Sequence, residues 1–194
     1  RMRAAALNLG GNNHGLNWNV WGTLEAAADY RNKYDGPVFN SKFKERNAGG
    51  YIGYNGNWGY SHLIVSSFNQ RLGLVEGDRD STGHFIKLLP GGLEAEPGAA
   101  DFNSTQPMVP YQIIHHNKIT SDNSFDIGSG RLAVNLGLQQ NRRMEFGNPD
   151  QPDQQGLYFD LNTFTYSAIY HLQDMKGWRT SIGFNGMAQS NLNK

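Results

Sequence analysis

The sequence predicts an all-β protein, an antiparallel up-and-down meander of about eight long strands. Apolar and polar residues alternate over long stretches, and successive side chains on a strand point to opposite faces. Glycine and aromatic residues are abundant, with 24 Gly and 12% aromatic residues in 194, which suits strands joined by turns. Short and long breaks in the alternation also follow one another along the chain. An up-and-down array, in which every second connection lies at the same end, produces this order.

The clearest pair of strands is in residues 157–190. Apolar side chains occupy alternate positions in residues 163–172, and the pattern returns from Trp178 onward. The polar break at 173–177 predicts a turn, and therefore a hairpin, with Tyr170 and Trp178 on either side of it. Each run keeps its alternation for about twice the ~5–6 residues usual in soluble domains. That length approaches the ~9–11 residues with which a tilted strand crosses a bilayer.

The longest alternation covers residues 16–30. Leu16, Trp18 and Val20 share one face, and Asn17 and Asn19 share the other. The only signal for a helix in this stretch is the alanine run at 26–28. Further strands are expected in residues 1–9, 48–58, 60–70, 112–127 and 131–143.

The connections differ in length in a regular order. Short breaks are expected at residues 10–15, 57–59, 128–130 and 173–177, and long ones at 31–47, 72–111 and 145–156. Outer-membrane barrels have short turns at one end and long loops at the other, whereas a Greek-key sandwich has no reason for this order. We therefore expect residues 1–194 to be part of one transmembrane β-barrel domain, as an excerpt of a longer protein.

Composition excludes some other classes. Lys+Arg and Asp+Glu are equal at 17 each, so overall charge does not favour a nucleic-acid partner. Without Cys there is neither a disulfide nor a thiolate metal site. No catalytic constellation is present, so we expect no enzyme activity and no cofactor. His115 and His116 are adjacent on an expected strand and face opposite sides, so the two cannot bind one metal ion without a bulge.

Several stretches resemble the barrel of TonB-dependent outer-membrane receptors, closest to the ferric-siderophore and ferric-citrate type. The resemblance covers most of the chain and rests on these segments: 32–36, 59–62, 122–125, 130–132, 137–146 (GLQQNRRMEF), 156–166 (GLYFDLNTFTY), 177–178 and 183–187. It implies a bacterial outer-membrane location and a barrel of about 22 strands. It also implies outer-membrane lipid as a partner, a ferric chelate as substrate, and contact with TonB through a plug domain. The plug and the barrel closure lie outside these residues, so this segment alone is not expected to transport.

On this interpretation the long loops form part of an extracellular ligand mouth, and polar residues continue it into the lumen. The residues expected near the ligand are Arg79, Asp80, His84, His115 and Arg143.

Two other classes remain open on the sequence alone. One is a plugless porin or barrel esterase, and the other is a soluble carbohydrate-binding β-sandwich. A sandwich would bury the apolar face beneath a second sheet. The residues that decide this are Trp18, Val20, Leu132, Val134, Leu136 and Phe184.

Overall fold

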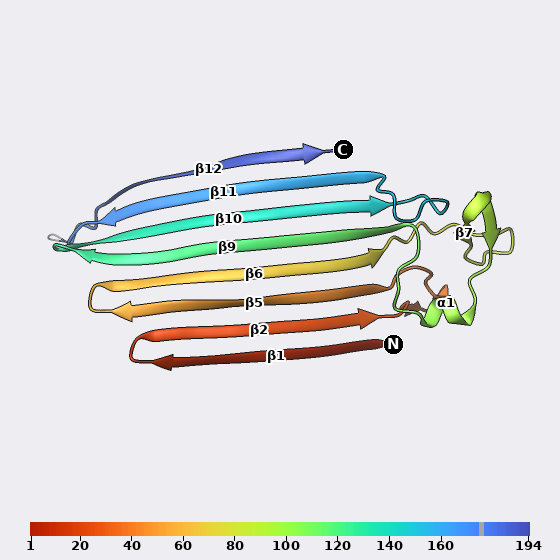
Figure 1. The fold of residues 1–194 in the computed structure, drawn as a ribbon, viewed down its shortest axis with the longest axis horizontal. Coiled ribbons are helices and arrows are strands. Elements are labelled where there is room, and N and C mark those ends of the chain that lie inside the picture. Colours follow the sequence, from red (N-terminus) through yellow and green to blue (C-terminus); the bar gives the residue numbers. More distant parts are fainter. Residues whose placement is uncertain (175–176) are drawn as a thin grey trace.

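The structure, a computed structural model, describes residues 1–174 and 177–194. Its main element is an eight-stranded antiparallel sheet in the order β1-β2-β5-β6-β9-β10-β11-β12, so each long strand pairs with the next one along the chain. Figure 1 shows the strands side by side in one layer, with β1 and β12 at its edges. The predicted meander of eight long strands is confirmed as an open sheet.

The strands are long enough to reach beyond the apolar part of a bilayer. They are β1 (Met2–Asn13), β2 (Leu16–Ala27), β5 (Phe43–Gly56), β6 (Gly59–Gly73), β9 (Tyr111–Ile127), β10 (Gly130–Phe146), β11 (Leu157–His171) and β12 (Ser181–Asn193). Each has 12 to 17 residues, which at ~3.3 Å per residue corresponds to roughly 40–56 Å.

Short and long connections alternate between the two ends over the first six connections, as predicted (Figure 1), but the last one, predicted to be short, extends from residue 172 to residue 180. The β1–β2 turn contains only His14 and Gly15, whose φ angles of 48° and 86° are both positive. A two-residue turn of that kind matches the twist of the strands it joins. The long connections at the other end are residues 28–42, 74–110 and 147–156.

The tight turns are staggered along the strand direction. Leu16, the first residue of β2, lies in the same register row as Tyr54, Ser61 and Asn123. From that row β9 continues to Ile127, four residues further (Figure 1). Strands that tilt relative to a barrel axis show such a stagger.

The prediction for residues 10–15 is wrong in part. Glycines at 10 and 11 suggested a turn, but both lie within β1, and the turn is confined to His14 and Gly15. A Cβ on Gly10 would meet the Asn19 side chain at 2.9 Å, and one on Gly11 would meet the Trp18 ring at 2.9 Å. These glycines therefore make room for side chains of the neighbouring strand.

The expected loops at 31–47 and 72–111 hold more structure than predicted. β5 already begins at Phe43, and β3 (Arg31–Asn32) pairs with β4 (Gly36–Pro37). The second loop contains β7 (Lys87–Leu89), a 3-10 turn (Pro90–Gly92), β8 (Leu93–Ala95) and α1 (Ala99–Asn103). No helix among the described residues is long and apolar enough to cross a membrane.

The last hairpin begins at Leu157, as predicted, although clear alternation starts only at residue 163. Its second strand differs from the prediction, because β12 starts at Ser181 rather than Trp178 and ends at Asn193 rather than residue 190. The predicted turn at 173–177 includes residues 175–176, which lie outside the described residues.

The sheet separates apolar and polar side chains onto its two faces. We call a set of exposed and half-buried apolar side chains on one face the apolar belt. The register places on it Leu7, Leu9, Leu16, Trp18, Val20, Leu24, Ile52, Tyr54, Leu63, Val65, Ile119, Phe125, Leu132, Val134, Leu136, Leu138, Phe164, Tyr166, Tyr170, Ile182 and Phe184. It covers residues 16–24 on β2 and 132–138 on β10, roughly 20–30 Å along each strand.

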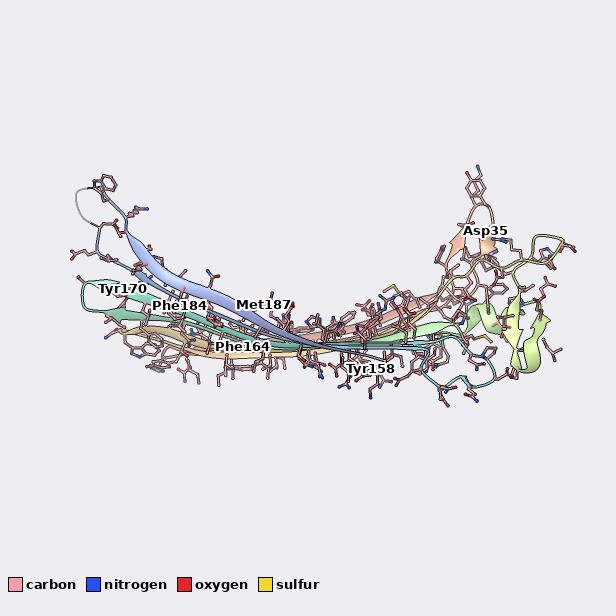
Figure 2. All side chains as sticks on the ribbon, turned by 90° about the horizontal axis from the view of Figure 1, so that it is seen from above. Asp35, Tyr158, Phe164, Tyr170, Phe184 and Met187 are labelled. Atoms are coloured by element: carbon pink, nitrogen blue, oxygen red, sulfur yellow. The ribbon has the colours of Figure 1, made fainter. Side chains whose placement is uncertain are left out.

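The belt is not covered by a second sheet in the described part of the chain. Trp18 is 40% exposed and Phe184 is 66% exposed, while Leu132 and Val134 are half-buried by their neighbours in the sheet. Figure 2 shows the sheet as a single curved layer with side chains on both faces. The arrangement that a sandwich requires at these residues is therefore not found.

The opposite face is mainly polar and internally hydrogen-bonded. His62 Nε2 lies 2.7 Å from Asn55 Oδ1, and Gln189 donates to Thr163 Oγ1 at 3.1 Å. This face also carries some apolar side chains, among them Ile64, Phe68, Ile169 and Met187. The two faces therefore suit different solvents.

Candidate functional site

The two longest loops, residues 28–42 and 74–110, pack into one folded unit at the long-loop end of the sheet. Their shared core consists of Val38, Phe39 and Phe85, with Phe102 and Met108 packed against it. Phe39 and Phe102 meet edge to face, with ring centroids 6.2 Å apart. The loops that the sequence indicated only as polar breaks are thus held by an apolar cluster of their own.

Asn40 connects the first loop to both ends of the second. It is 1% exposed, and its Nδ2 donates to the carbonyl oxygens of Leu74, Met108 and Pro110 at 3.2, 3.0 and 2.7 Å. Its Oδ1 accepts the backbone N–H of Met108 at 3.0 Å. We call this set of bonds the Asn40 clip. A side-chain amide suits this place because it supplies both donors and an acceptor.

Gly73, at the end of β6, is closely covered by the Asn40 clip. A Cβ at this position would lie 2.2 Å from the Asn40 carbonyl oxygen, which is backbone and cannot turn away. We expect Gly73→Ala to displace the first loop and to cost about 1–3 kcal/mol, the usual range for overpacking. Hydrogen exchange of residues 74–110 should accelerate. Gly147→Ala, whose Cβ would meet nothing within 4 Å, is the matched control. Equal exchange in both variants would contradict the clip.

A buried ion pair lies beside the clip. Lys42 Nζ is 3.0 Å from Asp29 Oδ2, and both side chains are fully buried. Lys42 Nζ also donates to the backbone carbonyl oxygen of Asp101, which lies within α1. Burial raises the pKa of Asp29 above its ordinary value, and the bond to Lys42 opposes the rise. The pair therefore holds three chain segments together, and each charge depends on the other.

A cleft of about 490 Å³ opens between the two loops. Its walls combine rings with a few charged groups, which is the usual composition of a small-molecule site. The lining residues used below are Tyr34, Asp35, Arg79, His84, Phe85 and Glu96. Asp35 lies at the tip of the β3–β4 ribbon, which projects from the sheet in Figure 2. We take this cleft as the candidate functional site.

The predicted residues Arg79, Asp80 and His84 come together in one turn of the second loop. Arg79 bonds to Asp35 Oδ1 at 2.8 Å and to the carbonyl of Gly83 at 2.9 Å, and its guanidinium lies 3.9 Å from the centre of the Phe85 ring. His84 Nδ1 lies 3.2 Å from Glu96 Oε1. Arg79 and His84 line the cleft, whereas Asp80 shapes the turn between them.

Asp80 stabilises this turn as a carboxylate. Its Oδ1 accepts the Thr82 hydroxyl at 2.7 Å and the backbone N–H groups of Thr82 and His84 at 2.8 and 3.0 Å. The bond from the Thr82 hydroxyl, and then that from the His84 amide, hold the pKa of Asp80 below its ordinary value of 3.8. Because the pKa of Asp80 is lower in the folded loop than in the unfolded chain, the ionised carboxylate stabilises the turn at pH values above 3.8. This stabilisation is lost as the pH falls through the pKa of the folded state.

We expect the amides of Thr82 and His84 to lose protection below about pH 4, after correction for intrinsic exchange rates. Asp80→Ala should remove the same protection at neutral pH. Asp78→Ala is the control, because the contact of Asp78 with this turn is a backbone one, from its carbonyl to the N–H of Ile86. Unchanged protection in Asp80→Ala, measured by hydrogen exchange, would show that the carboxylate does not hold the turn.

The other two predicted residues lie apart from the cleft and on opposite faces of the sheet. His115 is on the same face as the apolar belt, beyond its loop-side edge, with Nδ1 2.5 Å from Asn69 Oδ1. Arg143 is on the polar face and bonds to Glu145 Oε1 at 2.5 Å. Only Arg143 therefore continues the polar face toward the loops.

No metal centre is found in the described part of the chain, where no three ligating side chains gather. His116 turns to the polar face and bonds to Asn141 at 3.0 Å, away from His115, as the strand geometry predicted. The cleft residues Tyr34, Asp35 and Glu96 were not predicted. A run of turn-forming residues at 32–36 was the only local signal, and it does not indicate which distant loop it meets.

No protein family model, curated protein or solved structure matches this chain.

Proposed function

We propose that this chain is a wall segment of a bacterial outer-membrane β-barrel, with the belt against lipid and the polar face toward an aqueous lumen. The exposed belt is the observation that supports this most strongly. Its length of roughly 20–30 Å along each strand approaches the ~25 Å apolar band of outer-membrane barrels. An uncovered apolar surface of this extent in water would be an aggregation site.

Aromatic side chains support the same assignment at the turn end. Trp58 stacks on Phe125 with ring centroids 5.6 Å apart, and Tyr54 stacks on Trp58 at 6.3 Å. The hydroxyl of Tyr170 donates to the carbonyl of Ile127 at 2.9 Å. Such rings gather where a barrel leaves the hydrocarbon. The short turns are then periplasmic and the two packed loops extracellular.

We further propose that the barrel belongs to a TonB-dependent receptor that takes up a ferric chelate. The sequence resemblance supports this choice, and the loop cleft provides a place for a small ligand outside the membrane. Energy transfer from TonB would come through a plug domain. Arg79, His84 and the exposed ring of Tyr34 are the groups that a chelate would meet first.

Growth on defined iron sources tests the uptake function. Deletion of the gene should abolish growth on one ferric chelate while growth on ferrous iron continues, and loss of TonB should have the same effect. Unchanged growth on every ferric chelate, or uptake without TonB, would contradict the proposal.

A single aromatic side chain tests the cleft. Tyr34 is 91% exposed, so Tyr34→Ala should leave the loops folded and weaken chelate binding by about tenfold, as for an aromatic anchor. Tyr30→Ala is the matched control, because Tyr30 is also exposed but does not line the cleft. The measurement is binding of the radioactive ferric chelate to whole cells. Equal binding by the two variants would exclude the cleft as the site.

A further inference from the structure

The face that carries the belt changes chemistry in steps toward the loops. From β6 to β12 the first row beyond the belt holds neutral hydrogen-bonding groups, and the next rows include charges, whereas on β2 the belt extends to Leu24, level with Arg46. The neutral row consists of Ser67, Asn117, Gln140, Asn162 and Ser190. On β5 the sequence of this face is Ile52, then small residues, then Arg46 and Lys44. Successive rows on one face are two residues apart, which is roughly 6.6 Å along a strand. The change from apolar to neutral polar to charged rows therefore follows the order of acyl chain, glycerol region and head group in a lipid leaflet.

The charged rows are strongly basic at the β1 side. Arg3, Lys44, Arg46 and Arg71 project to this face from β1, β5 and β6. On the described strands the only acidic side chain of this face is Asp160, and Arg142 binds it at 3.1 Å. None of the four cations takes part in an ion pair among the described residues.

Three of these cations border a cleft of about 380 Å³. Arg3, Lys44 and Arg46 line it together with Ala5, Leu24 and Ala26. The cleft thus combines a cationic rim with a small apolar floor, and Leu24 at 59% exposed continues that floor into the belt. Two glutamates also border the cleft, Glu25 and Glu45, but they alternate to the opposite face, where Glu45 accepts a bond from Gln70.

Neighbouring groups hold two of the cations in place. Lys44 Nζ donates to Gln106 Oε1 at 2.8 Å, which connects it to the second loop. The guanidinium of Arg71 lies 3.9 Å from the centre of the Tyr111 ring. Both side chains keep further donors that these contacts do not use.

We propose that Arg3, Lys44 and Arg46 bind the phosphate of an anionic lipid head group in the membrane leaflet on the long-loop side. Ala5, Leu24 and Ala26 contact the first part of its acyl chain, and Arg71 adds long-range attraction. This inference rests on the proposed membrane location. Charge complementarity and continuity with the belt select a lipid, because a soluble anion would gain nothing from the apolar floor.

The test uses the complete gene product that contains this chain, in phosphatidylcholine nanodiscs with a minor fraction of phosphatidic acid. Native mass spectrometry counts the phosphatidic acid retained. We compare the wild type with the triple variant Arg3→Gln, Lys44→Gln, Arg46→Gln. Each cation near a membrane surface contributes about fivefold in affinity, so the triple variant should retain phosphatidic acid about a hundredfold more weakly. Added inorganic phosphate should not displace the lipid.

A matched variant removes the same charge elsewhere. Lys118→Gln, Arg131→Gln and Arg179→Gln change the polar face and the turn end, and should retain the lipid as the wild type does. Equal loss in both triple variants would overturn the site, and so would displacement by inorganic phosphate, which would indicate a free-anion site. Failure of every version to enter nanodiscs is seen before any lipid is counted, and it would overturn the membrane location itself.

Discussion

Leu136→Arg is expected to lower the stability of the bilayer-inserted protein by about 2–4 kcal/mol, the usual cost of a cation at the lipid-facing midplane of a barrel. Leu136 lies near the middle of the belt on β10, between Ser121 and Tyr166, and is 43% exposed. In water such an exposed residue would tolerate the change within about 0.5 kcal/mol. Urea titration of the protein in lipid vesicles, monitored by tryptophan fluorescence, measures the difference.

The neighbouring residue provides the control. Asn135 is exposed on the polar face of the same strand, and Asn135→Arg should cost little because that side remains in water. A loss for Leu136→Arg as small as that for Asn135→Arg would mean that the belt does not face lipid.

Lys42→Ala should open the packed loops, with a cost of about 3–5 kcal/mol, because it leaves Asp29 buried without its partner. It also removes the bond to the carbonyl oxygen of Asp101. The sheet is expected to stay folded, since the pair lies in the loops and outside the belt. The observable is the rate of protease cleavage within residues 28–42 and 74–110, measured on intact cells or vesicles.

A double variant separates the loss of charge balance from the loss of packing. Lys42→Met with Asp29→Leu removes both charges and fills similar volume, and such replacements are often neutral. It should restore most of the protease resistance. Resistance of Lys42→Ala equal to that of the wild type would show that the loops are held by other contacts, with the Asn40 clip as the next candidate.

The sequence predicted the sheet best where its two faces differ most. On β10 every second residue from Leu132 to Leu138 is apolar, and Asn135 lies between them, so the period of two is clear. The signal disappears where a strand is polar on both faces. The sequence therefore predicted a loop at Lys44, Glu45 and Arg46, although these residues belong to β5. A period of two can be recognised only where one face of the strand is apolar and the other is polar.

The cleft was less predictable because contacts distant in sequence build it. Arg79 was expected near a ligand, but its partner Asp35 is 44 residues away, and Asn40 bonds to residues 34 to 70 positions further along the chain. No local period encodes such contacts. Gly73 shows the same difficulty. A side chain at this position would collide with the backbone of Asn40, which belongs to a loop distant in sequence.

Site-directed spin labelling along β10 tests the central claim most directly. Residues 1–194 contain no Cys, so a single cysteine introduced at any of positions 131–142 carries the only label in this part of the protein. The measurements use the protein in lipid vesicles. Labels at 132, 134, 136 and 138 should contact oxygen dissolved in the lipid, and labels at 133, 135 and 137 should contact a water-soluble relaxation agent. Labels at 140 and 142 should lie outside the hydrocarbon region. Labels at 132–138 that all contact the water-soluble agent, or even-numbered labels that contact neither, would contradict a belt in lipid.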